Sequence, residues 1–181
     1  MFGADDANVS FRPIAETHSS CHSTLMATAH LVHGFLGVGK TTFAKRLERS
    51  LPAIRFSHDE WMVRFYGTDP PAHLFEGHSR AVTEQIDLLW PRCLELGVDV
   101  VLDVGFWSRK ERDQAKARAR ARRADVLLYR LNCPEYVARA RLRLRNENVD
   151  GNLLITDATY DLLRMRFEPL TPEEERREVD G

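Results

Sequence analysis

The chain has 181 residues, a length typical of one domain with a sizeable buried core. It carries 26 lysines and arginines against 27 aspartates and glutamates, and this balance excludes a general electrostatic attraction to nucleic acid or anionic membranes. Three widely separated cysteines without a C-x-x-C pair argue against a disulfide framework or zinc site and predict a reducing, cytoplasmic environment. No apolar run reaches the roughly 20 residues of a membrane-spanning helix.

Three segments are expected along the chain. Residues 1–25 show neither helical nor strand periodicity and are rich in polar residues, so we expect a disordered N-terminal extension. Residues 26–175 carry the apolar and helix-forming segments and are expected to form the folded domain. Residues 176–181 are mostly charged and are expected to be a frayed tail.

The folded domain begins with an apolar strand over residues 29–32, a glycine-rich loop and a helix over 43–50. The loop fits G-x-x-x-x-G-K-[ST], the phosphate-binding loop, in the strand–loop–helix order that the motif requires. The expected nucleotide contacts are Gly34, Phe35, Leu36, Gly37, Val38, Gly39, Lys40, Thr41 and Thr42. In this motif the lysine reaches the β- and γ-phosphates and the threonine hydroxyl binds Mg²⁺. The sequence therefore predicts ATP and Mg²⁺ as cofactors, with Lys40 and Thr41 in these roles.

A second strand is predicted over residues 53–57, and it ends just before Asp59. Ser57 and Glu60 fit a capping box for a short helix that follows. Asp59 is our candidate for the general base that accepts the proton of an attacking hydroxyl. The alternative is that Asp59 is only a carboxylate favoured by the helix dipole.

A long helix is predicted over residues 75–96, with a bend at Pro91, and a buried strand follows over 98–103. This strand ends in Asp103, in the pattern of a Walker B segment. Asp103 is a candidate to hold Mg²⁺ through water or to orient Asp59. A structural role, in which it bonds the amides of a loop, is the alternative.

Two further helices are rich in basic residues. The first begins at a capping box formed by Ser108 and Glu111, and its charges surround the helix, which favours a solvated surface over recognition of an acidic substrate. The second is predicted over residues 135–146. Its Arg141 and Arg145 lie one turn apart and are candidates to stabilise the transferred phosphate charge, with a solvated basic face as the alternative.

Segments outside the predicted strands and long helices are expected to complete the site. Phe106 and Trp107 are candidates for an apolar wall beside the acceptor, with core packing as the alternative. The polar residues 146–152 are expected to form a mobile flap, and Thr156 is predicted to cap a last helix that ends near Phe167.

Alternation of strands and helices predicts an α/β fold, a three-layer arrangement with a parallel sheet of four or five strands and helices on both faces. Ligands of such sheets bind at the carboxyl ends of the strands, where the phosphate loop, Asp59 and Asp103 are all expected. These features predict a P-loop kinase that moves the γ-phosphate of ATP to a hydroxyl of a small-molecule or nucleotide-like acceptor. The guanine-selecting N-K-x-D sequence is absent, which disfavours a GTP switch protein.

Two alternative functions stay open at this point. One is a polynucleotide 5′-hydroxyl kinase, for which nucleic acid is the acceptor. The other is a nucleotide-binding regulatory ATPase module. We expect neither membrane association nor an obligate protein partner.

The phosphate loop, the Ser-His-Asp-Glu sequence at residues 57–60, the strand ending at Asp103 and the Arg-Leu-Arg-Leu-Arg-Asn sequence at 141–146 resemble the small P-loop kinase family. This family includes polynucleotide kinases, chloramphenicol phosphotransferase and zeta toxins. Uncharacterised bacterial ATP-binding kinases are especially similar, because they carry V-L-D-x-G-F-W-S-R-x-x-R-D, found here at 101–113, and F-E-x-P-x-x-x-E. Residues 167–174 read F-E-P-L-T-P-E-E, which keeps the phenylalanine and both glutamates of the second motif but has its proline one position earlier.

The resemblance implies a sheet ordered 2-3-1-4-5, with Asp59 as general base and Arg141 and Arg145 in a lid. Relatives usually end with a fifth strand, whereas residues 173–181 have a poor composition for one. The sequence therefore leaves a sheet of four strands or of five.

Overall fold

The computed structural model describes residues 26–147 and 152–180. The extension expected over residues 1–25, and most of the flap expected over 146–152, lie outside the described residues. The elements in chain order are β1 (Thr28–His33), α1 (Lys40–Ser50), β2 (Ala53–Ser57), α2 (His58–Tyr66), α3 (Ala72–Glu95), β3 (Asp99–Gly105), α4 (Arg109–Arg120), β4 (Asp125–Asn132), α5 (Glu135–Glu147), α6 (Asp157–Arg164) and β5 (Arg177–Asp180).

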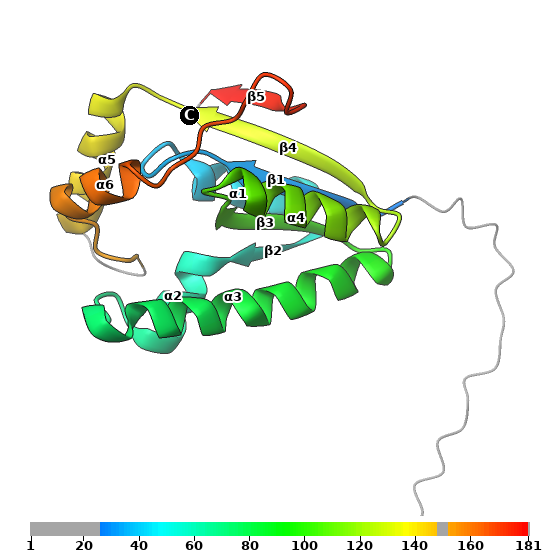
Figure 1. The fold of residues 1–181 in the computed structure, drawn as a ribbon, viewed down its shortest axis with the longest axis horizontal. Helices are drawn as coiled ribbons and strands as arrows, with labels where there is room; N and C mark the ends of the chain where they lie inside the picture. The colour runs from blue at the N-terminus through cyan, green and yellow to red at the C-terminus, as the bar shows by residue number, and fades with distance from the viewer. Residues whose placement is uncertain (1–25, 148–151, 181) are drawn as a thin grey trace, which may run out of the picture.

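The strands form one parallel sheet in the order β2-β3-β1-β4-β5 (Figure 1). This confirms the α/β class and the strand order 2-3-1-4-5, and it sets the number of strands in the described sheet at five. Central strand β1 pairs Leu31 with Leu102 of β3 on one side and with Leu128 of β4 on the other. Parallel neighbours need crossover connections, which place the helices over the faces of the sheet.

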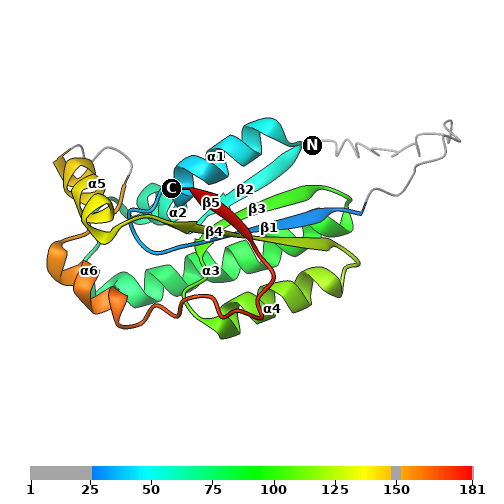
Figure 2. The same cartoon turned by 90° about the horizontal axis from the view of Figure 1, so that it is seen from above.

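Helix α1 covers one face of the sheet, and α3 and α4 cover the opposite face (Figure 2). Because neighbouring strand residues point to opposite faces, Val101 packs in the core cluster beneath α1 while Leu102 packs in the larger cluster on the other side. Trp90 of α3 is the largest fully buried side chain of that second cluster. No helix of the described chain is both long and apolar enough to cross a membrane.

Helices α5 and α6 lie together at the end of the sheet where the phosphate loop begins (Figure 1). Ion pairs join them, because Arg139 contacts Asp161 at 2.5 Å and Arg143 contacts Asp157 at 3.0 Å. Helix α6 begins as predicted, with the Thr156 hydroxyl accepting a hydrogen bond from the backbone amide of Thr159. The two helices therefore form one unit, which we call the α5–α6 lid.

The expectation of a frayed tail over residues 176–181 is wrong, because Arg177–Asp180 form β5 and pair with β4. The composition of this segment is poor for a strand, but β4 offers a free edge of backbone donors and acceptors. Arg130 of β4 also forms an ion pair with Glu178 at 3.2 Å, and Val179 packs against the core beneath α1. Tertiary contacts thus override local strand propensity.

Two local expectations differ in outcome. The predicted capping box at Ser57 is wrong, because the Ser57 side chain does not cap α2. Glu60 instead contacts Arg55 at 2.6 Å and Lys45 at 2.8 Å. Charge-assisted pairing with a guanidinium that is largely buried is stronger than the bond that a backbone amide offers. The box formed by Ser108 and Glu111 is present as predicted.

Candidate active site

The phosphate loop connects β1 to α1 and is shaped by its glycines. Gly39 is the N-cap of α1, in the left-handed region with φ of 95°, and no side chain caps the helix. Gly37 approaches α5 so closely that an added Cβ would lie 2.5 Å from the Ala138 carbonyl oxygen. The loop therefore presents an uncapped helix N-terminus, which is a suitable site for phosphate oxygens.

Lys40 lies at the start of α1 and reaches back over the loop. Its Nζ donates a hydrogen bond to the Phe35 carbonyl oxygen at 2.8 Å. Burial lowers the pKa of Lys40, and the nearby carboxylates of Asp103 and Asp59 oppose this shift. The lysine is thus within electrostatic reach of both acidic candidates.

Asp103 is buried at the carboxyl end of β3, on the face that α1 covers. Burial raises the pKa of its carboxyl, although the charge of Lys40 and a hydrogen bond from the Thr41 hydroxyl act in the opposite direction. Arg55 of β2 also contacts Asp103, at 3.5 Å. The sequence did not single out Arg55, although a charged residue in a buried strand is a usable signal.

The hydroxyl of Thr41 and the carboxylate of Asp103 are oxygen donors suited to Mg²⁺. The described residues hold no cluster of three or more His, Cys, Asp or Glu side chains that could bind a metal by themselves. This fits Mg²⁺ in a phosphate-loop site, because there the protein supplies one or two ligands and phosphates and waters supply the rest.

Asp59 lies in the first turn of α2, and its side chain keeps 60% of its surface exposed. Burial in the site would raise the pKa of its carboxyl, but a hydrogen bond from His58 and the charges of Lys40 and Arg145 outweigh it, so the pKa lies below its ordinary value. Asp59 is therefore ionised near neutral pH and open to an incoming group.

The two arginine candidates of α5 have different surroundings. Arg145 is partly buried: Nη2 donates to the Leu153 carbonyl oxygen at 3.2 Å, and Nε is buried without a hydrogen-bond partner among the residues that the structure describes. Burial lowers the pKa of Arg145, and Asp59 opposes this shift. Arg141 is exposed, and it lies one helical turn, about 6 Å along α5, before Arg145. The structure thus brings Arg145 but not Arg141 to Asp59 and Lys40.

Aromatic packing ties the phosphate loop to the lid, which the sequence did not predict. The Phe35 ring contacts Tyr160 of α6 edge-on at 4.8 Å and Phe167 at 5.1 Å. Trp107 joins the same cluster, at 5.6 Å from Phe35, so it packs against the loop. Phe106, in contrast, belongs to the core cluster on the α3–α4 face and lines a cavity there. The sequence signal for this packing was the pair of apolar residues, Phe35 and Leu36, at variable positions of the phosphate-loop motif.

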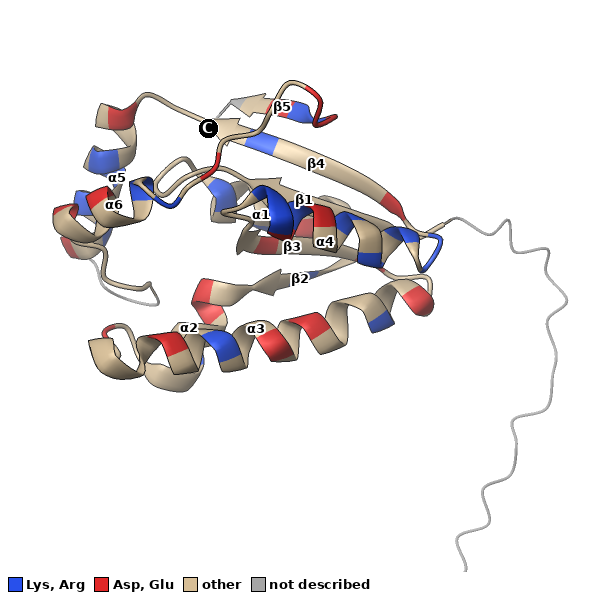
Figure 3. Ribbon diagram, in the orientation of Figure 1, with Lys and Arg blue, Asp and Glu red and all other residues tan. Residues whose placement is uncertain are grey.

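Basic residues recur along α4 (Figure 3), and most of them form ion pairs with described carboxylates. Arg118 contacts Asp87 at 2.6 Å, Arg122 contacts Glu95 at 3.1 Å, and Arg112 is buried against Glu174. These pairs disfavour recognition of nucleic acid, which needs cations free to meet phosphates, while the buried Arg112 departs from the solvated surface expected from the sequence.

Comparisons with known proteins identify the family and the fold. A family model described as an AAA domain (AAA_33) matches residues 30–170. Among solved structures, a putative kinase from Chloroflexus aurantiacus superposes with a TM-score of 0.66 at 15% identity, over 86% of this chain and 88% of that one. Kti12 from Chaetomium thermophilum, in complex with ADP-AlF3, gives a TM-score of 0.64 at 19% identity, over 84% and 88%.

The Pnkp1/Rnl/Hen1 RNA repair complex contains a third similar chain, with a TM-score of 0.64 at 16% identity. The match covers 78% of this chain but only 44% of that one. No match was found among curated proteins. At these identities the similarities establish the fold, and together with the family model they confirm the resemblance to the small P-loop kinase family.

Proposed function

Because the chain belongs to this AAA-domain family, we propose that it is a P-loop kinase that transfers the γ-phosphate of ATP to a hydroxyl group with the help of Mg²⁺. One observation supports the proposal above all others: Lys40 lies within electrostatic reach of Asp59, Asp103 and Arg145, which come from three other elements. A cytoplasmic location, which the cysteine pattern predicts, would supply the ATP.

Binding of the triphosphate falls to the loop and the start of α1. The uncapped amides at Gly39 and beyond would receive phosphate oxygens, and Lys40 would exchange its bond to the Phe35 carbonyl for the β- and γ-phosphates. Thr41 and Asp103 would hold Mg²⁺, which supplies charge neutralisation when bound. The residues of the loop from Gly34 to Thr42 keep their expected role as nucleotide contacts.

Proton transfer and charge stabilisation fall to Asp59 and Arg145. Asp59 is ionised and exposed, so it can accept the proton of an acceptor hydroxyl. Arg145 has a buried Nε that no described residue bonds, and a phosphate oxygen would satisfy this donor. A guanidinium in this position stabilises the negative charge of the transferred group.

The proposal is tested by incubating the full chain with γ-labelled ATP, Mg²⁺, a panel of hydroxyl metabolites and a 5′-hydroxyl oligonucleotide. We expect label on a metabolite, and loss of transfer with Lys40→Ala or after chelation of Mg²⁺. Label on the oligonucleotide, with binding that weakens steeply in salt, would instead establish a polynucleotide kinase. ATP consumption that no acceptor accelerates would favour a regulatory ATPase and overturn the kinase proposal.

A further inference from the structure

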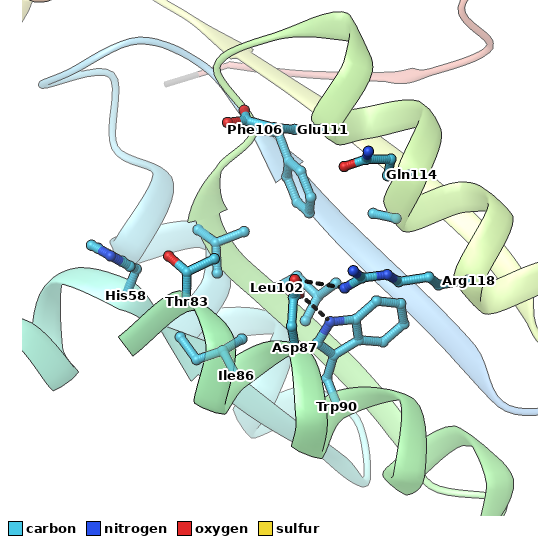
Figure 4. A pocket seen from close by; sticks show the side chains of 12 residues that line it. His58, Thr83, Ile86, Asp87, Trp90, Leu102, Phe106, Glu111, Gln114 and Arg118 are labelled. Atoms are coloured by element: carbon cyan, nitrogen blue, oxygen red, sulfur yellow. Dashed lines mark hydrogen bonds and ion pairs between the residues drawn. The ribbon is translucent and has the colours of Figure 1, made fainter. Parts of the chain in front are cut away.

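A cavity of about 190 Å³ lies on the α3–α4 face of the sheet, beneath β3 (Figure 4). Its floor comes from Leu102, Val104 and Phe106, three alternate residues that share one face of β3 and of the turn after it. Helix α3 supplies Ile86 and Trp90 to the wall. We call this space the β3 cavity.

The β3 cavity reaches His58, the residue next to the proposed general base. His58 lines one end, and it directly precedes Asp59 in the first turn of α2. The Nδ1 atom of His58 lies 3.6 Å from a carboxylate oxygen of Asp59, while its Nε2 lies 3.1 Å from the Ser79 hydroxyl. A molecule held in the cavity therefore has one end beside the residue that stands next to Asp59.

The two carboxylates of the lining and Arg118 already have partners. Asp87 forms an ion pair with Arg118 at 2.6 Å and accepts a hydrogen bond from the Trp90 indole at 3.2 Å (Figure 4). Glu111 accepts from the backbone amide of Ser108 in the capping box. Arg118 is the only Lys or Arg among the described lining residues, and its charge is met by Asp87.

These walls select against a polyanion. A polynucleotide acceptor requires cations that neutralise its phosphates, and the lining offers no such unpaired cation within the described residues. The size of the cavity lies below the roughly 300–1,000 Å³ that drug-sized ligands occupy. It is therefore suited to a compact molecule whose apolar part meets the β3 and α3 side chains.

We propose that the β3 cavity is the acceptor site, and that the acceptor is a compact, uncharged alcohol with an apolar portion. This inference rests on the proposed kinase activity. In the reaction the alcohol oxygen forms a bond to the γ-phosphorus, the bond from that phosphorus to the β,γ-bridging oxygen breaks, and ADP leaves with its electron pair. The alcohol proton passes to Asp59.

The test measures binding to the full chain by saturation-transfer NMR with three probes, namely benzyl alcohol, cyclohexanol and methyl β-D-glucoside. Ala115→Leu fills the cavity, because Ala115 lines it and is 7% exposed. Ala117→Leu makes the same change at an exposed position of α4 and is the matched control. We expect at least one probe to bind the native chain and the control, with affinity at least ten-fold lower for Ala115→Leu.

Thr83→Phe provides a second variant that does not disturb the core, because Thr83 lines the cavity from an exposed position of α3. It should also weaken probe binding, while ATP affinity stays unchanged in all three variants. Failure of every probe to bind, or equal binding by the two cavity variants and the native chain, would overturn the acceptor site.

Failure of the acceptor site and failure of the kinase proposal give different results. If labelled ATP donates its phosphate to an oligonucleotide and both cavity variants leave that transfer unchanged, the activity stands and the β3 cavity is excluded. If no acceptor takes label and Lys40→Ala consumes ATP as fast as the native chain, the kinase proposal itself fails, whatever the probes do.

Discussion

Arg112 and Glu174, which are 62 residues apart in the chain, form a two-pronged ion pair in which Nε and Nη2 donate to the two carboxylate oxygens at 2.8 and 2.9 Å. The Arg112 side chain is completely buried. Its hydrogen bond holds the pKa of Glu174 down at about 2. Arg112 also donates to the carbonyl oxygens of Phe106 and Glu168, so one side chain joins α4, the end of β3 and the segment before β5.

Replacing Arg112 alone should therefore unfold this junction. Arg112→Met leaves the buried Glu174 carboxylate with only Lys116, at 3.3 Å, as a cationic partner, and we expect a loss of about 3–5 kcal/mol in the free energy of unfolding. The double variant with Glu174→Gln should recover much of that loss, because the buried carboxylate is then gone and only Lys116, which is partly exposed, loses its partner. Urea denaturation of both variants measures the effect, and an equal loss in the two would contradict it.

Stability should also fall in mild acid because of His33. This side chain is 2% exposed, stacks on Phe167, and has a pKa that burial and the charge of Arg112 lower from 6.5 to about 4. Between pH 6.5 and about pH 4, His33 is therefore protonated in the unfolded chain but not in the folded chain. The free energy of unfolding consequently falls as the pH is lowered from 6.5 toward 4.

The difference corresponds to roughly 3 kcal/mol for this one group. Urea denaturation at pH 7 and pH 5 should show part of this loss in the native chain and a smaller loss in His33→Gln. The same pH dependence in both proteins would exclude His33 as its source.

Asp59→Asn separates proton transfer from nucleotide binding. The amide keeps the shape of the side chain but cannot accept a proton from the acceptor, so we expect transfer to fall by about 10²–10⁴. ATP affinity should be retained. Asp69→Asn makes the same change at another exposed position and should leave transfer unaltered. Undiminished turnover in the Asp59 variant would remove this residue from the mechanism.

The two arginines of α5 should differ sharply in their effect on transfer. Arg145 lies close enough to Asp59 to interact with it, whereas Arg141 is exposed. We expect Arg145→Met to lower kcat by about 10²–10³, the usual cost of losing one donor to developing charge. Arg141→Met should leave kcat within about two-fold of the native value. Steady-state assays compare the two variants. Equal losses of kcat would instead support the prediction from the sequence, in which both arginines stabilise the transferred phosphate charge.

Gly37 sets the distance between the phosphate loop and α5. An added Cβ would meet the Ala138 backbone in a residue whose φ is +76°, so Gly37→Ala should lower both the melting temperature and ATP affinity. Gly77→Ala is the control, because nothing lies within 4 Å of the added Cβ and Gly77 sits inside α3. There we expect stabilisation by about 0.5–1 kcal/mol. Unchanged ATP affinity in Gly37→Ala would contradict the close approach.

The sequence by itself determined the α/β class, the sheet order and the position of the phosphate loop, because strand periodicity, glycine spacing and the family motifs are local patterns. It also located Asp59 and Asp103, since parallel strands bring their carboxyl ends to one edge. Only the tertiary structure decided that Arg145 rather than Arg141 approaches Asp59, because one helical turn changes the distance to the site. The tertiary structure likewise decided that the charged residues 177–180 form β5. The strand β4 with which they pair, and the Arg112 side chain that holds Glu174 just before them, lie far from this segment in the sequence.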